Sequence, residues 1–134
     1  MEGSNGTRAT ACRGVRGATT VAGDDPREVE LAVAELLDAI VEANGCRPDD
    51  VAALTFTLTE ELADANPAAA ARAHGWTGVP LLMVREHGGD SRVPRCIRVL
   101  LLWNTTRTQR EIRHAYLRDA AVLRPDLAHQ RTLP

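Results

Sequence analysis

Arg98 is the residue of this sequence that the needs of folding account for least well. It lies inside the apolar run at residues 96–103, and such a run predicts a strand that is covered on both faces. A guanidinium stays charged at any accessible pH, so removing it from water is costly unless an anion meets it. The run contains no carboxylate. The anion must therefore be another part of the protein, with Glu86 as the internal candidate, or a bound ligand.

Further arginines, one carboxylate and one phenol could complete an anion-binding pocket around Arg98. Taken one at a time, Tyr116 fits a core position, Glu86 a solvated strand end and Arg72 a solvated helix end. Taken together, these residue types predict a pocket for a small polyanion, because arginine binds carboxylates through two parallel hydrogen bonds. The residues that stand out in this way are Arg13, Arg16, Glu86, Arg98, Tyr116 and Arg124.

The composition argues against several other classes of function. All 16 basic residues are arginine, so Schiff-base or general-base chemistry on lysine is excluded. The formal net charge is −2 and aromatic residues make up 3%, which does not suit binding to nucleic acid or to a membrane surface. No apolar run approaches the roughly 20 residues of a membrane span, and the polar N-terminal end predicts no signal peptide. Three widely spaced cysteines, Cys12, Cys46 and Cys96, predict reduced thiols in the cytoplasm.

Common catalytic and metal-binding patterns are also missing from the sequence. The four histidines show no metal-ligand spacing with one another or with cysteine. The sequence contains neither a Walker-type phosphate loop nor a dinucleotide fingerprint. The glycine-rich segment at residues 87–90 has no nucleophile elbow to accompany it. These patterns therefore give no support to metal, nucleotide or Ser-His chemistry.

Turn and capping signals predict the elements that must position the candidate residues. Strands are expected at 12–21, 53–57, 79–86 and 95–103. Helices are expected to start at Asp25–Pro26 and at Pro67, and a third after a capping box at 108–111. The buried stripe expected on the first helix is Leu31, Ala34, Leu37, Ile40 and Val41, and the one expected on the last helix is Ile112, Ala115, Tyr116 and Ala120.

This order of elements predicts a single α/β (α+β) domain with a mixed β-sheet packed by helices. The length of 134 residues is sufficient for one domain with a real core. Residues 1–10 are predicted to form a disordered N-terminal tail, 11–127 the folded domain and 128–134 a flexible C-terminal tail.

Three segments carry a more specific signal. They are residues 13–21 (RGVRGATTV), residues 94–100 (PRCIRVL) and residues 112–127, which contain IRHAYL and AVLRPDL. In this order and spacing the sequence resembles the monofunctional AroH-class chorismate mutases. Residues 67–72 and 75–80, followed by Glu86, are similar to the middle of that family too. The resemblance covers residues 11–127, almost the whole predicted domain.

The resemblance implies an assembly and a reaction. The family forms a homotrimer of the pseudo-α/β-barrel type with active sites at the subunit interfaces. It catalyses the [3,3] Claisen rearrangement of chorismate to prephenate, toward phenylalanine and tyrosine, without cofactor or metal. Chorismate is a dicarboxylate, which agrees with the arginines found above. A pericyclic rearrangement needs no nucleophile and no acid–base pair, which agrees with the missing patterns.

The resemblance also assigns roles to residues. Arg98 would place its cation at the ether oxygen, Arg16 and Tyr116 would bind substrate carboxylate, and Glu86 would accept a hydrogen bond from the ring hydroxyl. Arg72 would border the pocket mouth from a neighbouring subunit, and Arg124 would help to close the site. The remaining substrate contacts implied are Ala68, Leu81, Leu82, Met83 and Leu123.

The sequence departs from the family pattern at three secondary positions. Asn66 stands where relatives often carry phenylalanine, Ala69 where some carry lysine, and Met83 where some carry cysteine. These departures leave Arg16, Glu86, Arg98 and Tyr116 intact, so we expect activity with altered secondary contacts.

Two alternative functions remain open. One is an imine deaminase of the RidA type, which also uses an arginine at a trimer interface. The other is a trimeric carboxylate-binding module without catalysis. Residues 96–99 and 122–127 favour the mutase over the deaminase, and the intact Glu86 and Arg98 argue against a pure binder.

Overall fold

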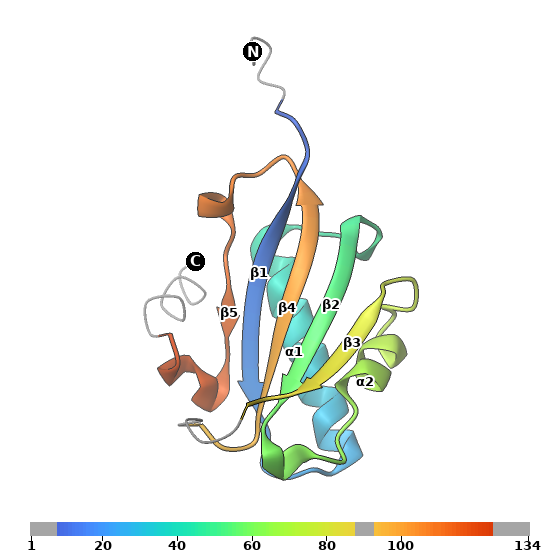
Figure 1. Cartoon of the computed structure of the whole chain (residues 1–134), viewed down its shortest axis with the longest axis vertical. Coiled ribbons are helices and arrows are strands. Elements are labelled where there is room, and N and C mark those ends of the chain that lie inside the picture. Colours follow the sequence, from blue (N-terminus) through green and yellow to red (C-terminus); the bar gives the residue numbers. More distant parts are fainter. Residues whose placement is uncertain (1–7, 88–92, 125–134) are drawn as a thin grey trace.

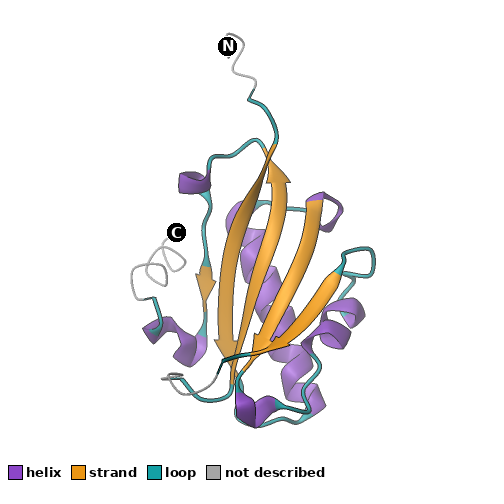
Figure 2. Ribbon diagram, viewed as in Figure 1, coloured by secondary structure: helices purple, strands orange, loops and turns teal. Residues whose placement is uncertain are grey.

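The computed structural model describes residues 8–87 and 93–124 of the chain. In this part, five strands form one mixed sheet in the order β3-β2-β4-β1-β5, and two helices lie on one of its faces (Figures 1 and 2). The pairs β3–β2 and β1–β5 are parallel, and β2–β4 and β4–β1 are antiparallel. The elements are β1 (Ala11–Thr20), α1 (Pro26–Asn44), β2 (Val51–Leu58), α2 (Pro67–Ala73), β3 (Leu81–Arg85), β4 (Cys96–Thr105) and β5 (Ala115–Tyr116).

This arrangement confirms the predicted α+β fold with a single mixed sheet. No helix among the described residues has both the length and the apolar character needed to cross a membrane. Most of the predicted tails, residues 1–7 and 128–134, lies outside the described residues, so their boundaries stay predictions.

Helix α1 begins and ends where the sequence predicts. The Asp25 side chain accepts a hydrogen bond from the Arg27 backbone, Pro26 is the first helical residue, and Gly45 ends the helix with a left-handed φ of 73°. The predicted buried stripe is partly wrong, because Leu31 is 56% exposed. The helix is apolar over a wide arc, and contact with the sheet selects a face rotated from the predicted one. That face consists of Val29, Ala32, Val33, Leu36, Leu37, Ile40 and Asn44.

Gly17 allows α1 to lie close to β1. A Cβ atom at this position would be 2.9 Å from Ile40 Cδ1 and 3.0 Å from Val99 Cγ1. Replacing Gly17 by alanine is expected to lower the free energy of unfolding by about 1–3 kcal/mol, because these methyl groups must move. Urea unfolding would measure the change. Gly14→Ala on the same strand is the matched control, since its Cβ would meet Leu100 Cδ1 at an ordinary 3.6 Å; equal stability of both variants would contradict the prediction.

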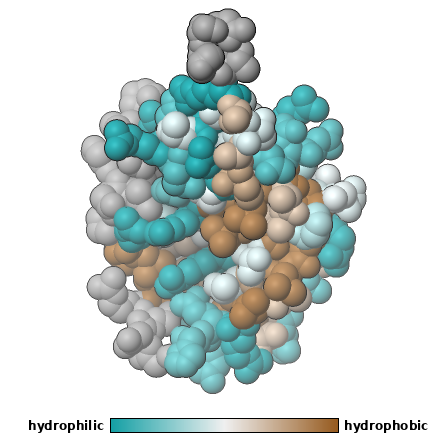
Figure 3. Space-filling view, turned by 45° about the horizontal axis from the view of Figure 1, so that its top comes forward, coloured by the Kyte–Doolittle hydropathy of each residue, from teal (hydrophilic) through white to brown (hydrophobic). Residues whose placement is uncertain are grey.

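The face of the sheet that the helices leave open carries the candidate site. Along β4, Ile97, Val99 and Leu101 are buried toward the helices, whereas Arg98 and Leu100 point to the other face. Leu100 is 44% exposed there, so the predicted covering of this strand on both faces is wrong for the isolated chain. Leu82 and Val84 are exposed on the same face, and Figure 3 shows apolar surface gathered in the middle of the view.

The prediction of a helix after residue 108 is wrong. The capping box is present, with Glu111 reaching back to Thr108, but the turn ends after residues 109–111. The chain then runs along the edge of β1 as β5, and a single 3₁₀ turn follows at 118–122. The Gln109 side-chain amide exchanges two hydrogen bonds with Gly14, of 2.6 and 3.0 Å. Pairing with a distant strand edge therefore overrides the local helical signal.

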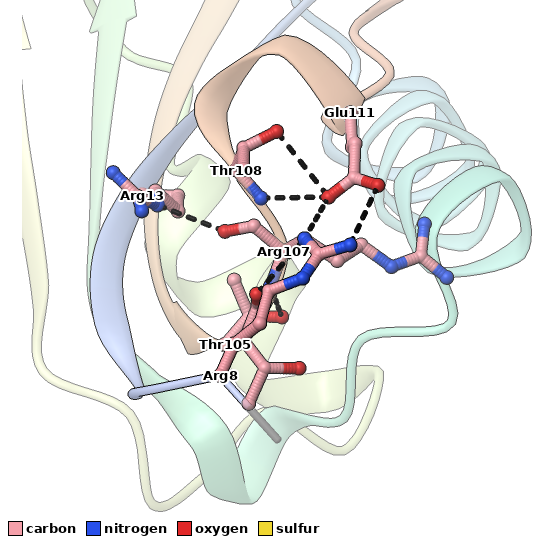
Figure 4. A network of polar contacts seen from close by, with 7 residues as sticks. Arg8, Arg13, Thr105, Arg107, Thr108 and Glu111 are labelled. Carbon is pink, nitrogen blue, oxygen red and sulfur yellow. Dashed lines mark hydrogen bonds and ion pairs between the residues drawn. The ribbon is translucent and has the colours of Figure 1, made fainter. Parts of the chain in front are cut away.

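A polar network fixes the N-terminal end of β1 (Figure 4). Arg8 Nη1 lies 2.6 Å from Glu111 Oε1, and the Thr108 backbone N–H donates to the same oxygen at 2.8 Å. The Arg8 guanidinium, together with the Thr108 backbone, lowers the pKa of Glu111 from 4.5 to about 2. Arg13 belongs to this end as well, because its Nε donates to the Arg107 carbonyl at 2.9 Å.

The lowered pKa makes the contribution of Glu111 depend on pH. A carboxyl group with a depressed pKa stabilises the fold above its unfolded-state pKa and loses that contribution as the pH falls through its folded-state pKa. Wild type and Glu111→Gln should therefore differ in unfolding free energy above about pH 5 and converge toward pH 2. Chemical unfolding at several pH values would measure this. The difference should shrink in an Arg8→Ala background, and a difference that does not change with pH would contradict the assignment.

Candidate active site

A cleft of about 870 Å³ lies on the open face of the sheet. Its volume is in the range of small-molecule sites. Strands β1, β2, β3, β4 and β5 all contribute to its lining, together with residues that follow β3 and the 118–122 turn. The lining residues are Arg16, Gly17, Thr55, Thr57, Val84, Arg85, Glu86, His87, Arg98, Val99, Leu100, Tyr116, Leu123 and Arg124.

The strand register explains why residues far apart in the sequence meet in this cleft. Val84, Thr57, Arg98, Ala18 and Tyr116 form one row across the five strands, each paired with the next. Residues in one row point to the same face, so the side chains of this row share the open side. The alanine in the row is small and leaves room between the arginine and the tyrosine, which lie roughly 10 Å apart by strand spacing.

Arg16 and Glu86 reach the same face from neighbouring rows. Arg16 is two residues before Ala18 on β1, and Glu86 is two residues after Val84 beyond β3. The Glu86 backbone N–H donates to the Leu58 carbonyl at 2.8 Å, which extends the β2–β3 pairing past the end of the strand. The Arg16 backbone N–H donates to His114 Nδ1 at 2.9 Å, which holds this edge of β1 against the chain leading to β5.

Arg98 and Glu86 form an ion pair inside the cleft. Arg98 Nη2 lies 3.1 Å from Glu86 Oε2, with side-chain exposures of 42% and 16%. Thr57 Oγ1 donates to the other carboxylate oxygen at 3.3 Å. The internal ion pair that the sequence left open as an alternative is thus present. It occupies one of the donor nitrogens of Arg98, while Nε is buried with no hydrogen-bond partner among the described residues. Because the side chain is 42% exposed and a guanidinium has five N–H donors, its remaining accessible N–H groups can still donate to a ligand.

The charges in the cleft favour an anionic ligand. Among the described residues, four arginines (Arg16, Arg85, Arg98 and Arg124) line it, against a single carboxylate, Glu86. Clefts lined by one sign of charge concentrate ligands of the opposite sign. Since the glutamate already pairs with one arginine, the arrangement suits a small molecule with more than one negative group and at least one hydrogen-bond donor.

Cys96, which lies near the Arg98–Glu86 ion pair, is not a nucleophile. Cys96 is fully buried beneath Tyr116 and Ala120, and burial raises the pKa of its thiol to about 11 against the opposing effect of the Arg98 charge. The thiol therefore stays protonated near neutral pH. Its contribution at this position is packing beside Arg98.

The structure brings six of the predicted site residues together. They are Arg16, Glu86, Arg98, Tyr116, Leu123 and Arg124. Tyr116 stands on β5 rather than on the predicted helix, and it is 9% exposed. Arg13 points to the opposite face of β1, because it is an odd number of residues from Arg16.

Five other predicted contacts do not line the cleft of this chain. Arg72 and Ala68 lie on α2, which is on the helical side of the sheet. Leu81 packs against the core, and Leu82 and Met83 are 61% and 42% exposed on the edge strand. Within the described residues of one chain, none of these five side chains lines the cleft, although Leu82 is exposed on the same face of the sheet.

Sequence reasoning missed several residues of the cleft. Thr55 and Thr57 alternate with buried residues of β2, a pattern that assigns them to a face but not to a site. Thr57 becomes significant only through its pairing with Arg98. Arg85 and His87 flank Glu86 in the sequence, and that adjacency was the available signal for them.

Comparisons with known proteins match most of the chain. The family described as "Chorismate mutase type I" matches residues 12–127. The chain is 51% identical over 116 residues to "Chorismate mutase AroH" of Thermus thermophilus, covering 86% of this chain and 95% of that protein. It is 39% identical over 117 residues to the protein of the same name in Bacillus subtilis, covering 87% and 92%. The solved structure of a chorismate mutase from Clostridium thermocellum superposes with a TM-score of 0.78 at 38% identity, covering 81% of this chain and 97% of that one.

Proposed function

Because the chain belongs to the type I chorismate mutase family, we propose that its cleft binds chorismate and holds it for rearrangement to prephenate. The observation that carries the proposal is the meeting of Arg16, Glu86, Arg98 and Tyr116 in one cleft. The same family membership favours an isomerase over the imine deaminase and the non-catalytic binder that the sequence left open.

The rearrangement is intramolecular and balances within the substrate. The ether C–O bond of chorismate breaks, a C–C bond forms between the enolpyruvyl side chain and the ring, and no group leaves the molecule. The protein has to hold the flexible substrate in the compact conformer in which the reacting carbons approach. It also has to stabilise the negative charge that develops on the ether oxygen when bond breaking runs ahead of bond formation.

The residues of the cleft suit these two tasks. Arg98 is the cation at the ether oxygen, and its pairing with Glu86 at 3.1 Å fixes the guanidinium before substrate arrives. Glu86 keeps oxygen lone pairs for the ring hydroxyl, since carboxylate oxygens accept more than one hydrogen bond. Arg16 and Tyr116 bind substrate carboxylate, and Leu123 and Arg124 cover the site from the end of the 118–122 turn.

We include a homotrimer with sites between subunits in the proposal. The open face of the sheet exposes Leu82, Val84 and Leu100, by 61%, 44% and 44%, and large apolar side chains gathered on one face are typical of an interface. Arg72, Leu82 and Met83 are exposed and then contribute to the cleft of a neighbouring copy, whereas Ala68 is buried and Leu81 packs in the core of its own chain. This accounts for the absence of the three exposed residues from the cleft lining of one chain. It also supplies the second cover that the apolar run of β4 predicts.

The proposal places the enzyme in the cytoplasm. Cys12, Cys46 and Cys96 are free thiols, which suits a reducing compartment.

A chorismate assay on the purified protein tests the proposal. Loss of the chorismate absorbance should accompany formation of a product of unchanged mass that elutes separately as prephenate. Arg98→Ala protein from the same purification is the control for a contaminating host mutase. A wild-type rate no higher than that of this variant would overturn the proposed function. Release of ammonia from an enamine substrate would support the deaminase instead.

A further inference from the structure

Two arginines of this chain adopt a backbone conformation that side chains of L-residues rarely take. Arg95 has a φ of 51° and Arg118 a φ of 53°, and they are the non-glycine residues with positive φ in the described part of the chain. Such a conformation costs free energy and persists where surrounding contacts impose it. Arg118 Nη1 donates to the carbonyl of Thr20, the last residue of β1, at 2.9 Å, and Arg95 Nε donates to the carbonyl of Val21, the residue that follows β1, at 3.1 Å.

Arg118 joins three elements at one point. Besides the Thr20 carbonyl on β1, its Nε donates to Glu35 Oε1 of α1 at 3.1 Å. The next backbone N–H, of Asp119, lies 3.4 Å from Thr20 Oγ1. The residue thus stands where the chain leaves β5 and enters the 118–122 turn.

That turn leads into Leu123 and Arg124, the last of the described residues that line the cleft. Ala120 is fully buried against Ala18, Cys96 and Tyr116, and Leu123 packs on the same cluster. The Leu123 N–H donates to the Ala120 carbonyl at 3.0 Å, so the turn passes its orientation directly to Leu123 and Arg124. These two residues line the cleft beside Tyr116.

We infer that Arg118 is a positioning residue that sets where Arg124 lies at the mouth of the cleft. The inference rests on the proposed function for its kinetic consequence. β5 pairs with β1 over two residues, and the Leu117 N–H adds one further bond to the Ala18 carbonyl at 2.9 Å. This short ladder alone holds the turn weakly, and the Asp119 N–H and the burial of Ala120 hold its middle. The Arg118 side chain adds the contacts that fix the start of the turn to both β1 and α1.

Arg95 is a matched comparison for the same kind of contact. It precedes β4, which carries Arg98 and is held by long ladders to both β1 and β2. The position of Arg98 is therefore fixed by the sheet without help from the Arg95 side chain. Loss of the Arg95 side chain should leave the cleft in place, whereas loss of the Arg118 side chain should not.

At both positions, replacement by glycine shows the effect of losing the side chain without adding backbone strain. Glycine adopts positive φ readily, so Arg118→Gly keeps the turn geometry accessible while removing the clamp. We expect Arg118→Gly to raise KM for chorismate roughly tenfold with kcat within about twofold of wild type. Arg95→Gly should change KM by less than about twofold.

A double-mutant cycle tests whether Arg118 acts through Arg124. In an Arg124→Ala background, Arg118→Gly should raise KM by less than about twofold further, because the group that it positions is already gone. A tenfold effect that persists in this background would overturn the inference. So would a KM of Arg118→Gly equal to that of wild type, or a loss confined to kcat.

Amide hydrogen exchange gives a readout that does not depend on turnover. In Arg118→Gly the amides of residues 117–124 should exchange faster than in wild type, with β4 unchanged. Unchanged exchange at 117–124 would overturn the inference whatever the kinetics show. If wild type fails to convert chorismate while exchange responds as expected, the proposed function fails and the positioning role of Arg118 stands.

Discussion

Replacing Arg98 by alanine is expected to lower kcat for chorismate rearrangement about a thousandfold, or roughly 4 kcal/mol of barrier. Negative charge appears on the ether oxygen in the transition state, and a fixed cation interacts with it more strongly there than in the bound substrate. The contact with Glu86 at 3.1 Å holds the guanidinium in place, so little reorganisation is needed at the moment of reaction. Steady-state kinetics at saturating chorismate would measure the loss, with circular dichroism confirming that the variant is folded.

Two further variants define which property of Arg98 matters. Arg98→Lys keeps the charge but replaces the planar fork by a point charge, so it should recover little of the lost rate. Arg47→Ala is the control for removing an arginine, because Arg47 forms an exposed pair with Asp49 at 3.5 Å. An exposed ion pair of that kind contributes roughly 0–1 kcal/mol to stability, and this one lies outside the cleft. An Arg98→Ala enzyme within about tenfold of wild type would remove electrostatic stabilisation by Arg98 from the mechanism.

The parts of the fold that sequence predicts well are those with local causes. The limits of α1 follow from Asp25, Pro26 and Gly45, which act within one turn of the helix ends. Arg98 and Glu86 stand out because a charged residue within or beside an apolar run needs an explanation wherever the run folds. These signals need no knowledge of what lies across the sheet.

The parts that sequence predicts poorly depend on distant partners. Thr57 contacts Glu86 and pairs with Arg98 only because β2 lies beside β4 in one particular register. The segment leading to Tyr116 has a helical capping box, yet it runs as an edge partner of β1. The Arg118 side chain donates to the Thr20 carbonyl, 98 positions earlier in the chain. In each case a long-range contact decides, and a single sequence does not contain its register.

The exposed apolar side chains connect the fold to the proposed assembly. β4 reads as a strand covered on both faces, and the helices of the same chain cover one. Leu82, Val84 and Leu100 remain exposed on the other face, where the cleft also lies. A copy of the chain packed on this face would bury them and bring Arg72 to the cleft. The site is therefore complete only if the proposed assembly forms.

Mixing two impaired variants tests that link. Arg98→Ala chains and Arg72→Ala chains are unfolded together in equal amounts and refolded, so that subunits assort at random. If each site takes Arg98 from one copy and Arg72 from its neighbour, about a quarter of the sites contain both residues. We expect about a quarter of the wild-type activity at limiting chorismate, well above the mean of the two variants refolded separately, because loss of one arginine that contacts the substrate costs roughly 10–100-fold.

The control is a pair of variants in the same cleft of the same chain. Arg16 and Arg98 both line the cleft of one copy, so a mixture of Arg16→Ala and Arg98→Ala leaves every site without one of them. This mixture should show no recovery, although its subunits assort in the same way. Native mass spectrometry would confirm mixed trimers in both experiments. Mixed trimers without recovery in the Arg98/Arg72 pair would contradict sites between subunits, and recovery in the Arg98/Arg16 pair would contradict the cleft as the place where both residues act.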